Sequence, residues 1–102
     1  IVEAAGRLLA DEAAYGAWAY EIHHAAKRDA PSGTLKELLR VLERAGYARP
    51  VDVASNRAGA VPGTHLLGFD SEADTITLQH TARSRAGFAQ ELIQSTAAVV
   101  RR

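Results

Sequence analysis

Four leucines between residues 35 and 42 place the strongest constraint on how this chain folds. They have the i, i+3, i+4, i+7 spacing of one helix face: Leu35, Leu38, Leu39 and Leu42. Residues 29–33 have the composition of a turn, and Gly46 and Pro50 end the pattern. We therefore expect an amphipathic helix capped by Thr34, whose spacing to Glu37 is that of a capping box. Such a helix must bury its leucine face against another layer.

Short strands on both sides of this helix are expected to form that layer. The first strand is predicted over residues 17–24, rich in aromatic residues and isoleucine. Three more are predicted downstream: residues 51–55, 63–69 and 74–80. The last two resemble a hairpin joined by a polar turn.

The two ends of the chain have helical patterns. An alanine-rich stretch predicts a helix from Ile1 to about Tyr15, which Gly16 ends, and a second apolar stripe begins after Ser84. The order α-β-α-β-β-β-α predicts an α+β fold, with a mixed or antiparallel four-stranded sheet and helices packed on one face. A chain of 102 residues holds one core, so residues 1–102 are expected to form one domain.

Composition excludes several classes of protein. Twelve basic residues balance twelve acidic ones, so no overall field attracts nucleic acid or an anionic membrane. No apolar run approaches the ~20 residues that a bilayer span needs. Cysteine is absent, which excludes disulfides and thiolate metal sites and fits a cytoplasmic location. Methionine is absent as well, even at position 1, so we expect a piece of a longer chain, excised, engineered or naturally truncated.

The densest group of reactive side chains lies between the first predicted strand and the leucine helix. It contains two imidazoles, an ammonium group and a helix start: His23, His24, Lys27, Gly33 and Thr34. Amide groups at a helix start and a nearby lysine favour a small di-anion such as a dicarboxylate. A histidine beside such a ligand can act as a general acid. Strand alternation places His23 on the same face as Glu21, opposite Trp18, Tyr20 and Ile22.

Each part of this group also has a simpler interpretation. Paired histidines at a strand end are often surface side chains, Lys27-Arg28 beside Asp29 is often a solvated charge cluster, and Gly33-Thr34 is often only a cap. Two histidines without a third ligand make a poor metal site, so no metal is expected. His65 and His80 lie on predicted strands facing apolar neighbours, which indicates a structural role.

The same segment resembles a known enzyme family. Residues 21–34, EIHHAAKRDAPSGT, look like the HHxxKxDAPSGT signature of dihydrodipicolinate reductase (4-hydroxy-tetrahydrodipicolinate reductase), which acts in the diaminopimelate route to lysine. Residues 57–59 and 63–65 resemble the R-x-G…G-x-H segment of that family, and residues 74–89 resemble its strand-then-helix ending. The similarity covers nearly the whole chain, although residues 90–92, QEL, stand where the family usually has N-G-A.

The resemblance implies a substrate-binding and oligomerisation domain, separate from a nucleotide-binding Rossmann domain whose glycine fingerprint this chain lacks. It implies that His23 is a general acid/base, that Lys27 donates a proton and binds a substrate carboxylate, and that His24, Gly33 and Thr34 bind substrate. The full enzyme would be a cytoplasmic homotetramer that uses NADPH or NADH, and this chain alone would bind neither cofactor. The alternative left open is a non-catalytic dicarboxylate-binding or oligomerisation module.

Overall fold

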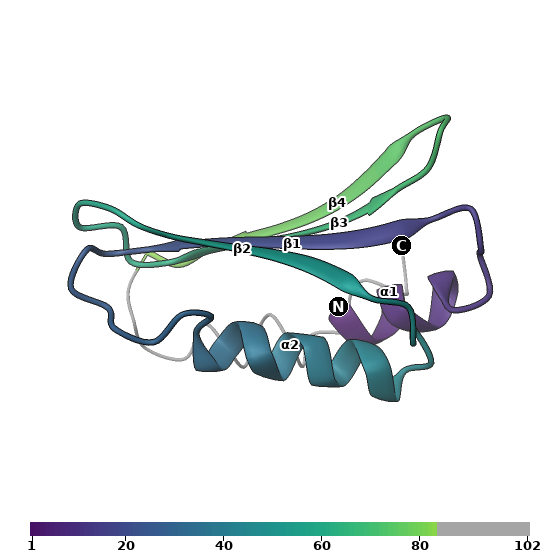
Figure 1. Cartoon of the computed structure of the whole chain (residues 1–102), viewed down its shortest axis with the longest axis horizontal. Coiled ribbons are helices and arrows are strands. Elements are labelled where there is room, and N and C mark those ends of the chain that lie inside the picture. Colours follow the sequence, from purple (N-terminus) through teal and green to yellow (C-terminus); the bar gives the residue numbers. More distant parts are fainter. Residues whose placement is uncertain (84–102) are drawn as a thin grey trace.

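The computed structural model describes residues 1–83, and within that range the chain forms two helices and one four-stranded sheet. The elements follow in this order: α1 (Val2–Leu9), β1 (Gly16–His23), α2 (Gly33–Arg44), β2 (Val51–Arg57), β3 (Thr64–Asp70) and β4 (Thr75–Thr81). Both helices lie on the same face of the sheet (Figure 1). The predicted α+β class, with helices on one face of a mixed sheet, is confirmed. The helix predicted after Ser84 lies outside the described residues.

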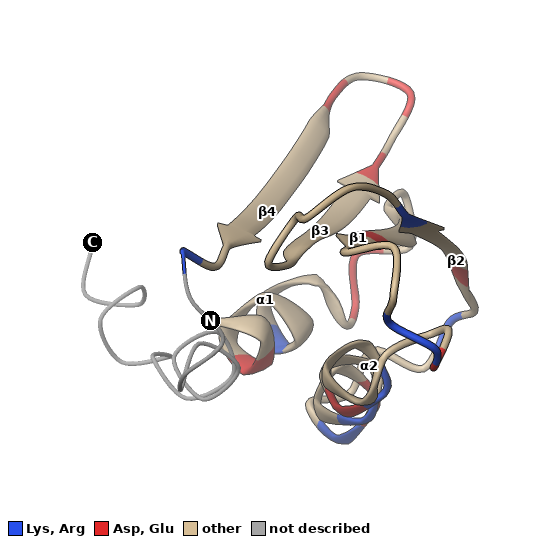
Figure 2. Cartoon of the chain, turned by 90° about the vertical axis from the view of Figure 1, so that its left-hand side faces the viewer, with Lys and Arg blue, Asp and Glu red and all other residues tan. Residues whose placement is uncertain are grey.

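The sheet has the strand order β2-β1-β3-β4. β1 and β2 are parallel and are connected through α2, whereas β3 is antiparallel to both β1 and β4. The predicted hairpin is therefore confirmed as β3–β4, and acidic residues gather at its turn (Figure 2). Because α2 connects two parallel strands, its N-terminus lies near the carboxyl end of β1. In an open α/β arrangement this is the usual place for a ligand.

The core lies between α2 and the sheet. Leu35, Leu38 and Leu42 are at most 1% exposed, and Phe69 of β3 is fully buried opposite them. Burying each such side chain contributes roughly 1.5–3 kcal/mol before the entropy of ordering is subtracted. α1 joins this core at Gly6, where a Cβ atom would lie 2.8 Å from the Cβ of Ala45, so the two helices can approach closely only at a glycine. None of the helices in residues 1–83 has the length and apolar character needed to cross a membrane.

The first helix is shorter than predicted, because α1 ends at Leu9 instead of near Tyr15. Alanine-rich residues would allow it to continue. Instead, the guanidinium group of Arg49, which follows α2, donates hydrogen bonds to carbonyl oxygens of residues 9, 10, 12 and 15. Two of these carbonyls, those of residues 9 and 10, would be bonded within the helix if it continued to Tyr15. The end of α1 is thus set by a residue about forty positions away.

The cap of α2 also differs from the prediction. Ser32, not Thr34, is the N-cap residue: its backbone is extended and its hydroxyl accepts a hydrogen bond of 3.1 Å from the amide of Leu35. Glu37 does not form a capping box but pairs with Arg40 and Arg44. The helix therefore starts two residues earlier than the capping-box pattern indicates.

Candidate active site

The buried face of β1 changes from apolar to polar along its length. Ala17 and Ala19 contact the core, and Glu21 and His23 continue the same face at the carboxyl end. Glu21 is completely buried and His23 is 4% exposed. The prediction that these two side chains share a face is confirmed, and that face is the one covered by the helices. A carboxylate in this position needs several hydrogen-bond donors to be stable.

Glu21 receives those donors from three parts of the chain. Its Oε1 accepts from His23 Nε2 at 2.9 Å and from Ser32 Oγ at 2.5 Å. Its Oε2 accepts from the Ser32 amide at 2.8 Å and from Ser55 Oγ at 2.7 Å, with a guanidinium nitrogen of Arg57 3.6 Å away. Burial raises the pKa of Glu21, but the bonds from Ser32, Ser55 and His23 outweigh it and lower the pKa from 4.5 to about 2. The carboxylate is therefore ionised at neutral pH.

His65 belongs to the same cluster. It stands directly opposite Glu21 in the antiparallel pairing of β1 and β3, and its Nε2 lies 3.4 Å from Glu21 Oε1. Its ring meets the His23 ring edge-on, with centroids 5.1 Å apart. Burial, and next the charge of His23, lower the pKa of His65 from 6.5 to about 4, so His65 is neutral at pH 7. The expectation that His65 faces apolar neighbours is wrong, because the strand register places it beside a carboxylate.

The cluster has the composition of a metal site but is better explained as a hydrogen-bonded network. One ligand atom from each of Glu21, His23 and His65 lies within 4.8 Å of the others, so the structure supplies the third ligand that the sequence argument lacked. Both oxygens of Glu21, however, already accept hydrogen bonds, and the guanidinium group of Arg57 lies where it would repel a cation. The absence of a metal stays a prediction.

A second, more exposed cluster lies at the start of α2. Lys27 Nζ is 3.0 Å from one carboxylate oxygen of Asp29, and the amide of Gly33 donates to the other at 3.2 Å. The hydrogen bond from Lys27 is the largest cause that lowers the pKa of Asp29. Arg57 donates to the carbonyl oxygen of Asp29 and so connects this loop to β2. The carboxylate of Asp29 therefore contacts Lys27 and the amide of Gly33, two of the groups predicted to bind the substrate.

The predicted site residues come together at one end of the sheet, but not through direct bonds between all of them. Ser32 bonds to the Glu21–His23 pair, and the next residue, Gly33, bonds to the Asp29–Lys27 pair. The adjacent backbone amides of Ser32 and Gly33, at the start of α2, thus connect the buried cluster to the exposed one. His24 follows β1 directly, and its carbonyl oxygen accepts from the amide of Lys27 at 3.1 Å. Thr34 lies half-buried in the first turn of α2.

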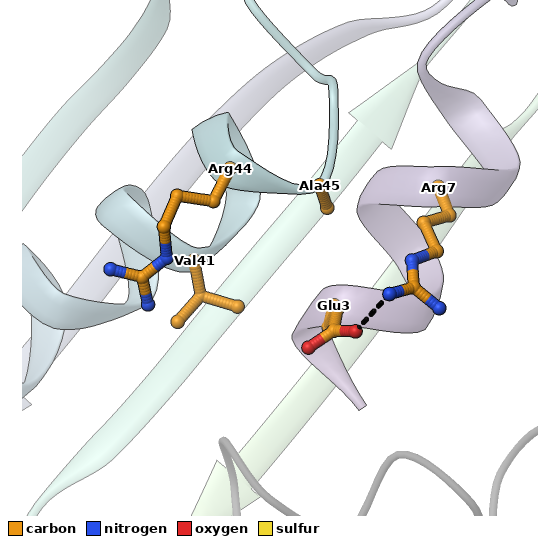
Figure 3. Close-up of a pocket in the computed structure, with 5 residues that line it drawn as sticks. All are labelled: Glu3, Arg7, Val41, Arg44 and Ala45. Carbon is orange, nitrogen blue, oxygen red and sulfur yellow. Dashed lines mark ion pairs between the residues drawn. The ribbon is translucent and has the colours of Figure 1, made fainter.

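Two cavities described elsewhere on the chain do not include this site. One, of about 220 Å³, lies between α1 and α2 and is lined by Glu3, Arg7, Val41, Arg44 and Ala45 (Figure 3). The other, of about 260 Å³, lies beneath the end of α2 and reaches Val51. In the first cavity Glu3 and Arg7 pair with each other, which leaves it without chemistry related to His23 or Lys27.

Sequence reasoning missed four residues that hold the cluster together: Ser32, Ser55, Arg57 and His65. The strand alternation that paired Glu21 with His23 contained the necessary signal. A glutamate on the covered face of a strand requires several donors, and the serines and the arginine are the side chains able to supply them. Which donors reach Glu21 depends on strand register, which the local pattern does not contain.

Comparison with known proteins identifies close relatives. A family model described as the C-terminus of dihydrodipicolinate reductase matches residues 1–102. The 4-hydroxy-tetrahydrodipicolinate reductase of Methanoregula boonei is 36% identical and is matched over 98% of this chain and 44% of the relative. That of Thermosipho africanus is 41% identical over 68% of this chain and 30% of the relative. The chain therefore spans less than half the length of these relatives.

A solved structure shows the same fold. The dipicolinate-bound dihydrodipicolinate reductase from Paenisporosarcina sp. TG-14 aligns with a TM-score of 0.71 at 20% sequence identity. The alignment covers 98% of this chain and 45% of that chain. At this level of identity the similarity concerns the fold.

Proposed function

Since this chain belongs to the dihydrodipicolinate reductase family through the C-terminal region of that family, we propose that it binds the enzyme's dicarboxylate substrate, 4-hydroxy-tetrahydrodipicolinate. One observation carries the proposal: where the end of β1 meets the start of α2, the Glu21–His23 pair is bonded to Ser32 and the Lys27–Asp29 pair to the next residue, Gly33. The reaction would be reduction of the substrate to tetrahydrodipicolinate in lysine and diaminopimelate biosynthesis.

Asp29 supports a carboxylate site at this position. Its side chain is bound by Lys27 and by the amide of Gly33, which are donors of the kind that a substrate carboxylate needs. An incoming carboxylate would exchange with Asp29 and gain the amide of Thr34 in the same turn of α2. Because Asp29 is exposed, this exchange requires no rearrangement of the core. His24, on the adjoining loop, is proposed to contact the other end of the substrate.

The acid–base roles fall to His23 and Lys27. Reduction of the ring requires a proton as well as a hydride, and these two side chains belong to the two clusters joined by Ser32 and Gly33. His23 is held on a strand by a buried carboxylate, so its ring is fixed, whereas Lys27 lies on a loop and can follow the substrate. We therefore assign His23 as the general acid/base and Lys27 as a proton donor that also binds the carboxylate.

The described residues do not fit a nicotinamide nucleotide. Residues 24–33, which lead from β1 into the first residue of α2, contain a single glycine, Gly33, and its amide is already bonded to Asp29. A pyrophosphate would therefore find no glycine-rich cradle here. NADPH or NADH is expected to bind elsewhere in the full enzyme, and the purified chain is expected to show no turnover when substrate and NADPH are added.

Titration calorimetry with pyridine-2,6-dicarboxylate tests the binding site. The unaltered chain should bind this ring analogue, and Lys27→Ala should weaken binding at least tenfold, because about 1.4 kcal/mol of charge-assisted contact is lost. Asp29→Asn is the matched control: it removes a competing carboxylate from the same loop and should strengthen binding. Absence of binding to the unaltered chain would contradict the proposal. Equal affinity in the Lys27→Ala variant would contradict the role of Lys27.

The catalytic assignment is tested in the full-length enzyme. His23→Ala should lower kcat by about 10²–10⁴, the usual contribution of a positioned acid or base. An unchanged rate would end the assignment of His23.

The outer face of the sheet supports a second function, oligomerisation. Trp18, Tyr20, Ile22 and Leu66 are half-buried side chains that alternate with the buried residues of β1 and β3, so they lie on the face of the sheet opposite the helices. An apolar stripe of this kind is a typical interface between copies of a chain. We propose a homo-oligomer, a tetramer as in the family. Light scattering should show that Ile22→Asp lowers the mass to that of a monomer; an unchanged oligomer would contradict this interface.

A further inference from the structure

The His23 ring is held through one specific nitrogen. Its Nε2 lies 2.9 Å from Glu21 Oε1, and both side chains are buried. Within residues 1–83 the hydrogen bonding of the His23 ring runs through Nε2, and none involves Nδ1. The two ring nitrogens therefore have different surroundings, and only one of them remains for chemistry.

The direction of this hydrogen bond follows from the charge on Glu21. The pKa of Glu21 is lowered to about 2, so the carboxylate carries no proton at neutral pH and can only accept. His23 must then be the donor, and Nε2 must carry a hydrogen in both the neutral and the protonated ring. A neutral imidazole has one N–H group, so neutral His23 has a lone pair on Nδ1.

The carboxylate itself cannot rotate away from His23. Ser32 binds both Glu21 oxygens, through its amide at 2.8 Å and its hydroxyl at 2.5 Å, and Ser55 binds Oε2. Ser32 is also the N-cap of α2, so the start of the helix and the orientation of Glu21 are fixed together. Among residues 1–83, the other charged or titratable groups in contact with the pair are His65 on β3 and Arg57 on β2.

We propose that Glu21 is a positioning residue that holds His23 by Nε2 and leaves Nδ1 as the nitrogen that exchanges a proton with the substrate. The inference rests on the proposed role of His23. In the acid step the Nδ1–H bond breaks, its electron pair stays on Nδ1, and the proton forms a bond with the substrate atom. The Nε2–H bond to Glu21 is kept throughout, so the ring does not turn between the two protonation states.

Nitrogen NMR of the histidine side chains tests this proposal without substrate. A ¹⁵N-histidine-labelled sample is measured at a pH where His23 is neutral, and its signals are assigned by their loss in His23→Gln. The expected result is a protonated, pyrrole-type Nε2 and an unprotonated, pyridine-type Nδ1. The Nδ1–H tautomer, or an even mixture of the two, would overturn the proposal.

Glu21→Gln gives a second and sharper readout. The Ser32 amide can only donate, so the oxygen of the new side-chain amide should take the Oε2 position and its NH₂ group should face His23. His23 Nε2 would then have to accept, and its tautomer should switch to Nδ1–H. Asp29→Asn, which removes the other carboxylate of the site, should leave the tautomer unchanged. A Glu21→Gln variant that folds and keeps the Nε2–H tautomer would overturn the role of Glu21.

The unaltered sample alone decides the proposal if Glu21→Gln fails to fold. The result also separates this inference from the proposed function. Nε2–H without binding of pyridine-2,6-dicarboxylate supports the positioning by Glu21 and contradicts the substrate site. Binding together with the Nδ1–H tautomer contradicts the positioning alone.

Discussion

Acid should destabilise this chain in two successive pH ranges, and the first is due to His65. The pKa of this histidine is lowered from 6.5 to about 4 in the folded state, chiefly by burial. Above pH 6.5 His65 is neutral in both the folded and the unfolded chain, and its full contribution to stability is present. As the pH falls from 6.5 to 4, the unfolded chain binds a proton that the folded chain does not accept. Stability is therefore lost across this range, by about 3 kcal/mol.

Glu21 produces the second range. Its pKa is about 2 in the folded chain against 4.5 ordinarily, so its contribution is complete above pH 4.5 and is lost as the pH falls towards 2. This loss is again on the order of 3 kcal/mol. A small domain has a total stability of roughly 5–15 kcal/mol, so the two losses together should bring the chain close to unfolding below pH 4.

Urea unfolding followed by the fluorescence of Trp18, the single tryptophan, measures both losses. The free energy of unfolding is compared at pH 7.5, 5.5, 4 and 3, at roughly physiological ionic strength. His65→Gln should remove most of the change in the free energy of unfolding between pH 6.5 and 4, whatever it does to stability at pH 7.5. His24→Gln, which removes a histidine from the adjoining loop, should keep it. If His65→Gln loses as much stability as the unaltered chain over this range, the argument from burial is wrong.

Three further substitutions test the packing. Ser32→Ala should lower the free energy of unfolding by about 2–4 kcal/mol in chemical denaturation, because it removes the cap of α2 and a donor to buried Glu21. A loss under about 1 kcal/mol would contradict this double role of Ser32. Leu38→Ala should cost 2–5 kcal/mol at its fully packed position, and a smaller loss would mean that the leucine face of α2 is not the core. Gly68→Ala would place a Cβ 2.1 Å from the Trp18 ring, so it should shift the emission of that ring and cost about 1–3 kcal/mol, whereas Gly16→Ala, with open space around it, should do neither.

The elements of the fold could be predicted from local pattern alone. The leucine spacing predicted α2, and alternation predicted the strands to within a few residues, because periodicity records which face of each element is buried. The ends of the elements could not be predicted in the same way. α1 stops at Leu9, where the guanidinium group of Arg49 satisfies backbone carbonyls, and Ser32 becomes the N-cap of α2 because Glu21 and Leu35 both bond to that residue.

The residues of the candidate site could be chosen from the sequence motif, but their hydrogen-bond partners could not. Imidazoles, an ammonium group and a helix start fall within one short segment of the sequence, which is why these residues could be chosen: His23, His24, Lys27, Gly33 and Thr34. The contact between Glu21 and His65 depends on how β1 and β3 pair, and a shift of one residue would turn His65 to the opposite face.

The sequence by itself determined which side chains are available and which faces they occupy, since both follow from residue type and from the period of helix or strand. Only the tertiary structure decided that Glu21 is bonded by Ser32, Ser55 and His23, and that His65 stays neutral beside it. The physical reason is that a buried carboxylate is stable only among donors from several segments. Those segments meet only when the sheet and α2 are assembled.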